Sequence, residues 1–258
     1  MIEIETGKVT VGDNLAEIVL PEGWGYLQQA SAKRVVEQYW GNPPGGTLGM
    51  VLPPEWEVAE DSPTWGIIVD FEADGYVEDD DAADIDFDDL LSTMKADAVE
   101  SNKARKKQGY QTVDLLGWAE PPHYDPASHT LYWAKDLKFE GEEESVLNYN
   151  MRVLGRRGVL NLNAVASIEN LAMVKAGSDL ILPATKFTSG NRYTDFVSGD
   201  KVAAYGIGGL IAGKLLLKGG FLKILAGLWK PIAVGVVALG AFVMKIFGGK
   251  KNAQPSEA

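Results

Sequence analysis

Acidic side chains crowd into one short stretch of the sequence, and this stretch is where metal chemistry could occur. Glu78–Asp89 reads EDDDAADIDFDD, the densest run of carboxylates in the 258-residue chain. Carboxylate oxygens are the ligands that Ca²⁺ and Mg²⁺ prefer. Four aspartates of this run are therefore the candidate metal ligands: Asp79, Asp81, Asp84 and Asp86.

The spacing of the run does not match a calcium-binding EF-hand loop. Counted from Asp84, the sixth position is Asp89 and the twelfth is Lys95. An EF-hand requires glycine at the sixth position and glutamate at the twelfth. The alternative interpretation is a solvated loop that leads into the acid-rich beginning of a helix.

The remaining residues offer little for catalysis. His123 and His129 are the only histidines, and cysteine is absent. Both histidines fall in the segment PPHYDPASH, which we predict to be one turn-rich loop, and two ligands do not complete a zinc site. The sequence also has no nucleophile elbow, zinc-protease motif, dinucleotide fingerprint or P-loop. We therefore identify no catalytic residue and expect no cofactor.

Four aromatic residues lie around the same predicted loop: Trp118, Tyr124, Tyr132 and Trp133. Because neighbouring residues of a strand point to opposite faces, Tyr132 and Trp133 can both be buried only if both faces of a sheet are covered. The alternative is an aromatic groove for an apolar or peptide ligand.

Two arginines, Arg156 and Arg157, lie between Gly155 and Gly158 in a predicted turn between strands. In so acidic a chain we expect them to form ion pairs. The alternative is an anion site.

The elements that would hold these residues indicate an α+β fold with a mostly antiparallel sheet and two or three packed helices. Lys8–Val11 and Leu15–Leu20 flank the turn signal GDN, which predicts a hairpin. Further strands are predicted at Leu48–Leu52, Trp65–Phe71, Thr112–Trp118, Thr130–Lys138, Val146–Leu154 and Val159–Ala166.

Three helices are predicted. Ser31 begins a short one that ends at Tyr39, and Ser167 begins one that reaches Lys175. The longest is Phe87–Gln108, where apolar residues recur at helical spacing. Aspartates begin this helix, basic residues end it and Gly109 follows, as the helix dipole and C-terminal capping favour.

The C-terminal part of the chain differs from the rest. Pro231–Phe247 has one charge, Lys245, and no polar side chain between Ile232 and Met244. A helix in a water-soluble core would have a polar face. At roughly 1.5 Å per residue this stretch spans about 26 Å, near the thickness of a bilayer core of about 30 Å. We predict a helical membrane anchor or hairpin.

The anchor is expected within residues 199–251, with candidate helices at 202–217 and 221–247. Gly209 and Gly213 have the GxxxG spacing that permits close packing of helices in membranes. A buried hydrophobic hairpin of a soluble domain is the alternative. The residues expected to contact lipid are Tyr205, Leu210, Phe221, Trp229, Pro231, Val236, Phe242 and Phe247.

Charge divides the chain at the same place. Residues 1–198 contain 16 Lys and Arg against 34 Asp and Glu, a net charge of −18. Residues 199–258 contain 8 lysines against 2 acidic residues, a net charge of +6, and the two parts sum to −12. An acidic body repels phosphate backbones, which argues against nucleic acid as a partner. The lysines of the tail favour anionic lipid headgroups.

Several unusual segments occur in a fixed order from Gly7 to Lys251. They are GNPPGGTLGMVLP, GYVEDDDA, DFDDLL, NKAR with GY, GWAEPPHYD, LYWA, NYNMRVLGRRGVLNLN and RYTDF with DKVAAYGIGGLIAG. In these the chain resembles a bacterial family of uncharacterised membrane-anchored proteins, known as domain of unknown function 2167. The resemblance implies an extracytoplasmic domain followed by a C-terminal anchor in the inner membrane, and it implies no catalytic residues.

We therefore expect an acidic α+β domain at 1–198, an anchoring tail at 199–251 and a disordered end at 252–258. The expected function is non-enzymatic binding or scaffolding at the bacterial envelope. Its partners would be the lipid bilayer, an envelope protein or a second copy of the chain. The alternatives are a divalent-metal enzyme that uses the acidic run, and a glycine-rich tail that self-assembles in the membrane.

Overall fold

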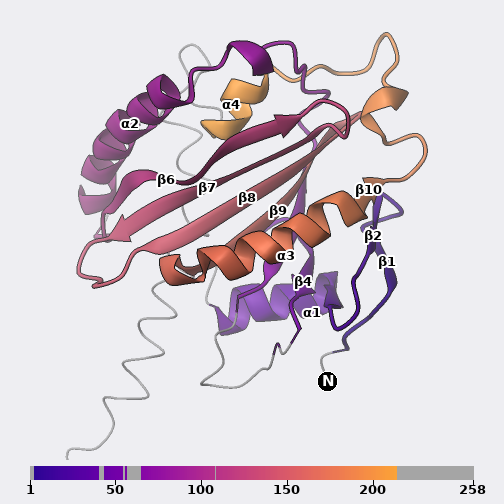
Figure 1. Cartoon of the computed structure of the whole chain (residues 1–258), viewed down its shortest axis with the longest axis horizontal. Helices are drawn as coiled ribbons and strands as arrows, with labels where there is room; N and C mark the ends of the chain where they lie inside the picture. Colours follow the sequence, from indigo (N-terminus) through magenta and orange to yellow (C-terminus); the bar gives the residue numbers. More distant parts are fainter. Residues whose placement is uncertain (1–2, 41–43, 55, 57–64, 108, 214–258) are drawn as a thin grey trace, which may run out of the picture.

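The computed structural model describes residues 3–40, 44–54, 56, 65–107 and 109–213 (Figure 1). Two antiparallel sheets form the framework: a seven-stranded sheet in the order β3-β4-β5-β9-β8-β7-β6 and a three-stranded sheet in the order β1-β2-β10. The predicted α+β class with antiparallel sheets is confirmed. The strands are β1 (Lys8–Val11), β2 (Ala16–Val19), β3 (Gly25–Gln28), β4 (Thr47–Leu52), β5 (Ile67–Glu72), β6 (Val113–Asp125), β7 (Thr130–Phe139), β8 (Val146–Gly155), β9 (Gly158–Ser167) and β10 (Thr185–Phe187).

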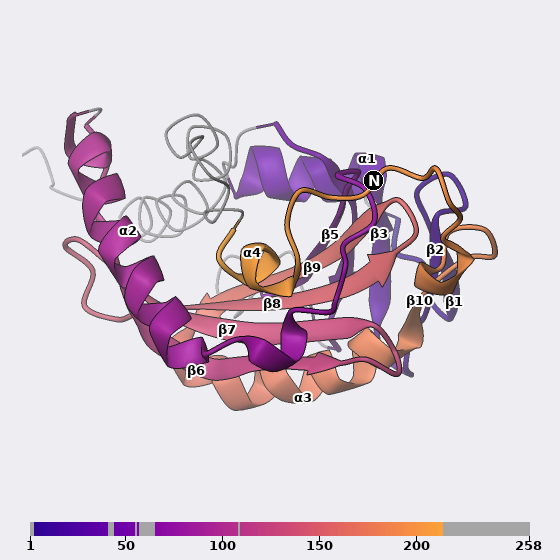
Figure 2. The same ribbon diagram turned by 90° about the horizontal axis from the view of Figure 1, so that it is seen from above.

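Helix α3 (Leu171–Ala184) covers one face of the large sheet (Figure 2). Side chains at every second position of β8 and β9 point toward it, as the period of a strand requires. They form the largest apolar core together with Val174 and Ile181 of α3 and the small sheet. Gly177 of α3 lies against two tryptophans, because an added Cβ would lie 2.7 Å from Trp24 and 2.8 Å from Trp65.

The opposite face carries the other helices. Helix α1 (Gln29–Lys33) and the π-helical segment Arg34–Tyr39 pack on β3 and β4, and helix α2 (Phe87–Lys107) packs along β6 (Figure 2). The predicted stripe of α2 is confirmed in part, since Leu90 and Met94 are buried. In Figure 2, helix α4 (Ile207–Ile211) lies above the same face.

Strand β6 is longer than predicted. It continues past Trp118 through the prolines to Asp125, with register shifts at three places along its pairing with β7. Proline is tolerated there because β6 is an edge strand of the sheet, and bulges accommodate residues that cannot pair. The predicted loop PPHYDPASH is therefore mostly strand, and the turn is confined to 126–129.

Residues 199–213 belong to the globular core. Val202 forms a parallel bridge with Tyr76, and Ile207, Leu210 and Ile211 of α4 are buried in a second apolar core. Gly75 permits this contact, because it adopts φ +113° and an added Cβ would lie 2.6 Å from the Lys201 carbonyl oxygen. The structure thus extends the globular unit to at least Gly213, past the predicted boundary at residue 198.

Most of the predicted anchor lies outside the described residues. This holds for the whole of 221–247 and for residues 214–217 of the first candidate helix. In the described part of the chain, no helix is both long and apolar enough to cross a bilayer. The predicted lipid contacts that lie outside the described residues are Phe221, Trp229, Pro231, Val236, Phe242 and Phe247.

Candidate functional site

The four aspartates proposed as metal ligands do not converge. Asp81 accepts hydrogen bonds from the backbone N–H groups of Ile207 (2.8 Å) and Gly208 (3.0 Å), at the beginning of α4. Asp86 accepts bonds from two N–H groups at the beginning of α2, both 3.0 Å long. Asp84 is exposed, and Asp79 turns toward aromatic residues. Across the residues that the structure describes, no group of three or more His, Cys, Asp or Glu side chains could hold a metal ion.

Asp79 is the centre of an aromatic cluster. The Tyr124 hydroxyl donates a hydrogen bond of 2.5 Å to Asp79 Oδ2, and the Tyr193 hydroxyl lies 2.9 Å from Asp79 Oδ1. His129 Nδ1 lies 3.3 Å from the Tyr124 hydroxyl, and the His129 ring packs 4.1 Å from that of Tyr193. The Tyr76 ring stacks on that of Tyr193, with ring centres 4.3 Å apart, and is tilted against that of Phe196, with ring centres 4.2 Å apart.

Hydrogen bonding sets the charge of this cluster. Burial alone would raise the pKa of Asp79, but the hydrogen bonds from Tyr124 and Tyr193 outweigh it and lower that pKa below 3.8. Burial and the same carboxylate raise the pKa values of Tyr124 and Tyr193, so both hydroxyls keep their protons. The cluster is thus a carboxylate held by two neutral tyrosines. It joins the loop after β5 to β6 and to the segment Tyr193–Asp195.

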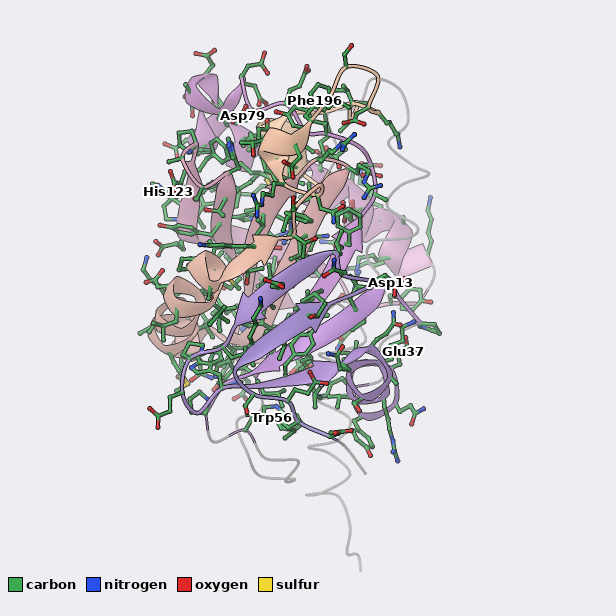
Figure 3. All side chains as sticks on the ribbon, turned by 90° about the vertical axis from the view of Figure 1, so that its right-hand side faces the viewer. Asp13, Glu37, Trp56, Asp79, His123 and Phe196 are labelled. Carbon is green, nitrogen blue, oxygen red and sulfur yellow. The ribbon has the colours of Figure 1, made fainter. Side chains whose placement is uncertain are left out.

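The two histidines belong to different elements, so the prediction that they share one loop is wrong. His129 is in the turn before β7, with φ +52°, whereas His123 belongs to β6 and pairs with Tyr132. His123 is exposed, and its ring lies 5.2 Å from that of Tyr132. Figure 3 shows Asp79 and Phe196 at the same end of the molecule, with His123 apart from them.

The aromatic residues around this hairpin also separate. Trp133 is 1% exposed in the core below α4, while Tyr132 packs in the core below α3, so both faces are covered as predicted. Trp118 donates its indole N–H to the Phe87 carbonyl (3.2 Å) at the beginning of α2. These residues therefore do not form the single aromatic groove of the alternative interpretation.

One arginine of the pair has the predicted ionic role. Arg156 forms a bidentate ion pair with Asp200, at 2.7 and 2.9 Å, and holds the pKa of that carboxyl near 2. Arg157 donates to the amide oxygen of Asn191 at 2.5 Å. The expectation of an ion pair is confirmed for Arg156.

The predicted membrane residues that are described lie in the globular unit. Leu210 is 6% exposed in the core, and the Tyr205 hydroxyl donates to Asp74 at 2.7 Å. Gly209 is buried, where an added Cβ would lie 2.7 Å from the Cβ of Tyr205. Gly213 follows α4 with φ +72°, the left-handed conformation that commonly ends a helix. In this structure both glycines therefore shape α4 rather than a contact between membrane helices.

A polar layer on the sheet is the feature that the sequence analysis missed. On the face opposite α3, six polar side chains occupy neighbouring positions of β7, β8 and β9. Register places Lys135 opposite Asn148, and Asn163 opposite Asn150. We call this set the polar sheet face: Lys135, Asn148, Asn150, Arg152, Asn161 and Asn163.

Several of these groups are deeply buried. Asn148 and Asn150 are each 4% exposed, and Asn161 is 2% exposed. Burial of an amide is unfavourable unless its polar atoms form hydrogen bonds. The signal was present in the segments NYNMR and NLN, where polar residues alternate with apolar ones. The same alternation is typical of a strand with one solvated face. The sequence therefore does not distinguish a buried polar layer from a polar face in contact with water.

A chain of hydrogen bonds connects the polar sheet face. Arg152 donates to the amide oxygens of Asn163 (3.0 Å) and Asn150 (3.2 Å). Asn150 in turn donates to the amide oxygen of Asn148 (2.9 Å). The Arg152 guanidinium also lies over the Trp133 ring, 5.0 Å from its centre, which fixes its plane.

Other polar atoms of this region have no partner. Among the described residues, Lys135 makes neither a hydrogen bond nor an ion pair. The indole nitrogen of Trp133 and the amide oxygen of Asn161 are buried without a hydrogen bond in the described structure. Burial and the neighbouring Arg152 lower the pKa of Lys135 from 10.5 to about 8. Unsatisfied buried groups are uncommon in folded proteins, so these atoms call for an explanation.

Fold and site together define an α+β domain whose antiparallel sheet has one apolar face and one partly polar face. The chain belongs to a family described as a protein of unknown function, DUF2167, whose model matches residues 3–241. No curated protein matches the chain.

Two solved structures are similar to this chain over part of its length. The solution structure of cyanobacterial PsbP (CyanoP) from Synechocystis sp. PCC 6803 is 10% identical, covering 73% of this chain and 94% of that one with a TM-score of 0.40. LpqN, described as involved in cell envelope biogenesis of Mycobacterium tuberculosis, is 15% identical, covering 72% and 92% with a TM-score of 0.35.

Proposed function

We propose that the protein is a non-enzymatic binding domain of the bacterial envelope, and that its ligand contacts the polar sheet face. One observation carries the proposal: the unpartnered amine of Lys135 beside a buried amide network. A lone cation within a sheet lowers the stability of the free protein. Such a group is expected where a ligand supplies the missing partner.

The network is organised for binding rather than for bond making. Its members are an arginine, a lysine and four asparagines, and an asparagine amide neither gains nor loses a proton at neutral pH. Fixed amides recognise the hydrogen-bonding pattern of a ligand. The alternative of a metal enzyme has less support, since Asp81 and Asp86 already accept backbone hydrogen bonds.

We further propose that the tail holds this domain at the membrane, with the domain on the extracytoplasmic side. The support is the apolar sequence of residues 231–247 and the net positive charge of 199–258. The described chain ends just after α4, which lies on the same side of the sheet as the polar sheet face (Figure 2). An anchored tail would therefore keep the polar sheet face near the bilayer, where a lipid or an envelope protein is available.

Site-specific crosslinking in cells tests the proposal. A photoreactive phenylalanine derivative replaces Val165, a half-buried residue of β9 on the polar side, opposite Asn148. The matched control replaces Met173, which is 53% exposed on α3. We expect adducts with a lipid or an envelope protein from position 165 and none from position 173. Equal adducts at both positions, or none at 165, would contradict the proposed function.

A further inference from the structure

We propose that Lys135 and Asn148 together bind an anionic oxygen group, a carboxylate or a phosphate, on the ligand of the polar sheet face. The inference rests on the proposed function and specifies the chemistry of its ligand. The two residues are direct partners in the register of β7 and β8. Side chains opposite each other in antiparallel strands start about 5 Å apart at Cβ, so one small group can contact both.

The direction of the hydrogen bonds along β8 indicates whether a ligand would have to supply donor or acceptor atoms. In both bonds the acceptor is the residue nearer to Asn148 in the sequence. Arg152 donates to Asn150, and Asn150 donates to the Asn148 amide oxygen. Within the described residues the Asn148 amide NH₂ has no acceptor, so the series of bonds ends there with an unused donor. Lys135 adds an ammonium group, which can only donate. Two adjacent donors without an acceptor call for a ligand that supplies acceptor atoms.

The charged groups near Lys135 further narrow the class of ligand. The charged group that most affects Lys135 is another cation, Arg152, and within the described structure no carboxylate pairs with Lys135. This is unusual in a chain with 36 acidic residues against 24 basic ones. The nearby acids Asp70 and Glu72 act on Arg152, and Asp70 also accepts a bond of 2.7 Å from Asn161 of β9. A negatively charged ligand would relieve the repulsion between the two cations, whereas a neutral carbonyl would not.

The guanidinium of Arg152 positions the network without closing the site. Its donors are directed to Asn163, Asn150 and the Met151 carbonyl, and its plane is held over Trp133. It thus fixes the orientation of the amides along β8, while Lys135 remains available. Lys135 and Asn148 are therefore the residues that contact the ligand, and Arg152 positions the amides.

The reactivity of the Lys135 amine provides a direct test on the full-length protein in mild detergent. Trace acetylation followed by mass spectrometry reports the unprotonated fraction of each lysine. A bound anion favours the charged amine, and each unit by which the pKa rises slows acetylation about tenfold below that pKa. We expect inorganic phosphate or acetate to slow acetylation of Lys135 several-fold, relative to chloride at equal ionic strength.

Two controls make the result specific. Lys138 lies on the same strand but on the opposite face, where its amine donates to the Glu143 carbonyl at 2.5 Å, so its rate should not change. The variant Asn148→Asp places a carboxylate beside Lys135 and should mimic the ligand. Acetylation of Lys135 should then be slow without added anion, and phosphate should slow it no further.

Vesicles separate the two sources of the anion. Protection after reconstitution into phosphatidylglycerol vesicles, but not by free phosphate or acetate in detergent, would identify a lipid headgroup, and the reverse would identify a soluble anion. Either result supports the proposal. The proposal is overturned if neither the free anions nor the vesicles slow acetylation of Lys135, or if chloride slows it equally well. Crosslinks from position 165 with an unprotected Lys135 would retain the binding function and reject the anionic ligand.

Discussion

At the scale of single residues, the Asp79 carboxylate is partly buried and yet remains charged, although burial favours the neutral form of a carboxyl group. Tyr124 and Tyr193 make this possible by donating to separate oxygens of the carboxylate. Hydrogen bonds to a charged group typically contribute about 1.5–3 kcal/mol each. The cluster therefore ties three segments of the chain together through one ionised side chain.

Replacing Asp79 with asparagine should lower the free energy of unfolding at pH 7 by about 1–3 kcal/mol. Because the pKa of Asp79 is lowered on folding, its contribution is present above pH 4 and is lost as the pH falls through the folded value. The difference between wild type and variant should thus shrink in acid. Urea unfolding at several pH values measures it. Asp80→Asn, at an exposed neighbour, is the control, and an equal loss in both variants would contradict the role of Asp79.

Lys135 should have the opposite effect on stability. Its folded pKa of about 8 lies below the value of 10.5 expected without burial, so the unfolded chain binds this proton more tightly. Below pH 8 the cation therefore destabilises the fold, by at most about 3 kcal/mol at roughly 1.4 kcal/mol per pKa unit. Lys135→Met should raise the free energy of unfolding at pH 7.

The pH dependence identifies the cause. For the wild type, Lys135 makes the free energy of unfolding rise between pH 8 and about 10.5, and the methionine variant should lack this part of the slope. Thermal or urea unfolding across that range gives the comparison. Lys138→Met, on the same strand, should retain the slope. If Lys135→Met is less stable than the wild type at pH 7, the amine has a favourable partner and the binding hypothesis loses its basis.

At the scale of elements, the acidic run acts through helix ends. Asp81 satisfies two backbone N–H groups that begin α4, although more than a hundred residues separate them in sequence. Gly206 makes room for it, because a Cβ there would lie 2.5 Å from Asp81 Oδ1. The helix is only five residues long, so it depends on such contacts rather than on its own propensity.

Asp81→Ala should therefore lower the free energy of unfolding by about 1–2 kcal/mol, the usual value of a side-chain cap. Asp84→Ala is the matched control, since Asp84 is exposed and should change stability by less than about 0.5 kcal/mol. Chemical denaturation of both variants distinguishes capping from metal binding. If both aspartates are metal ligands, Ca²⁺ or Mg²⁺ should stabilise the wild type and neither variant.

Local signals explain which elements were predictable. The sequence predicts the end of helix α2 to within one residue, because its apolar stripe and its terminal charges agree. Strands β1, β7, β8 and β9 were also found, since each is a continuous apolar or alternating run. The sequence does not predict strand β3, and it predicts an end of β6 before the prolines. Both depend on pairing with a neighbouring strand, which no local window contains.

The same limit applies to the candidate sites. The sequence indicates Asp79 only as a metal ligand, because its partners Tyr124 and Tyr193 are 45 and 114 residues away along the chain. Asn148 and Asn163 become neighbours of the same network only through the pairing of β8 with β9. Residue type can suggest that a position is functional. Register decides which positions form a site.

At the scale of the whole molecule, the border between domain and tail has a measurable position. The fragment 1–213 retains α4 and the bridge of Val202, whereas 1–198 loses them. Burial of one large aliphatic side chain contributes about 1.5–3 kcal/mol, and three such residues of α4 are buried: Ile207, Leu210 and Ile211. We expect 1–213 to unfold cooperatively and 1–198 to be several kcal/mol less stable. Equal denaturation midpoints would place the border at residue 198 instead.

The stable fragment then provides the reference for membrane attachment. Full-length protein should sediment with membranes after detergent-free breakage of cells, while 1–213 should stay in the supernatant. The 231–247 segment is long enough for most of a bilayer core and has no polar side chain between Ile232 and Met244. High salt should not release the full-length chain, because insertion depends on apolar burial and not on attraction of lysines to headgroups. Release by salt would instead indicate surface attachment, and a dispersed full-length chain in the supernatant would exclude the anchor.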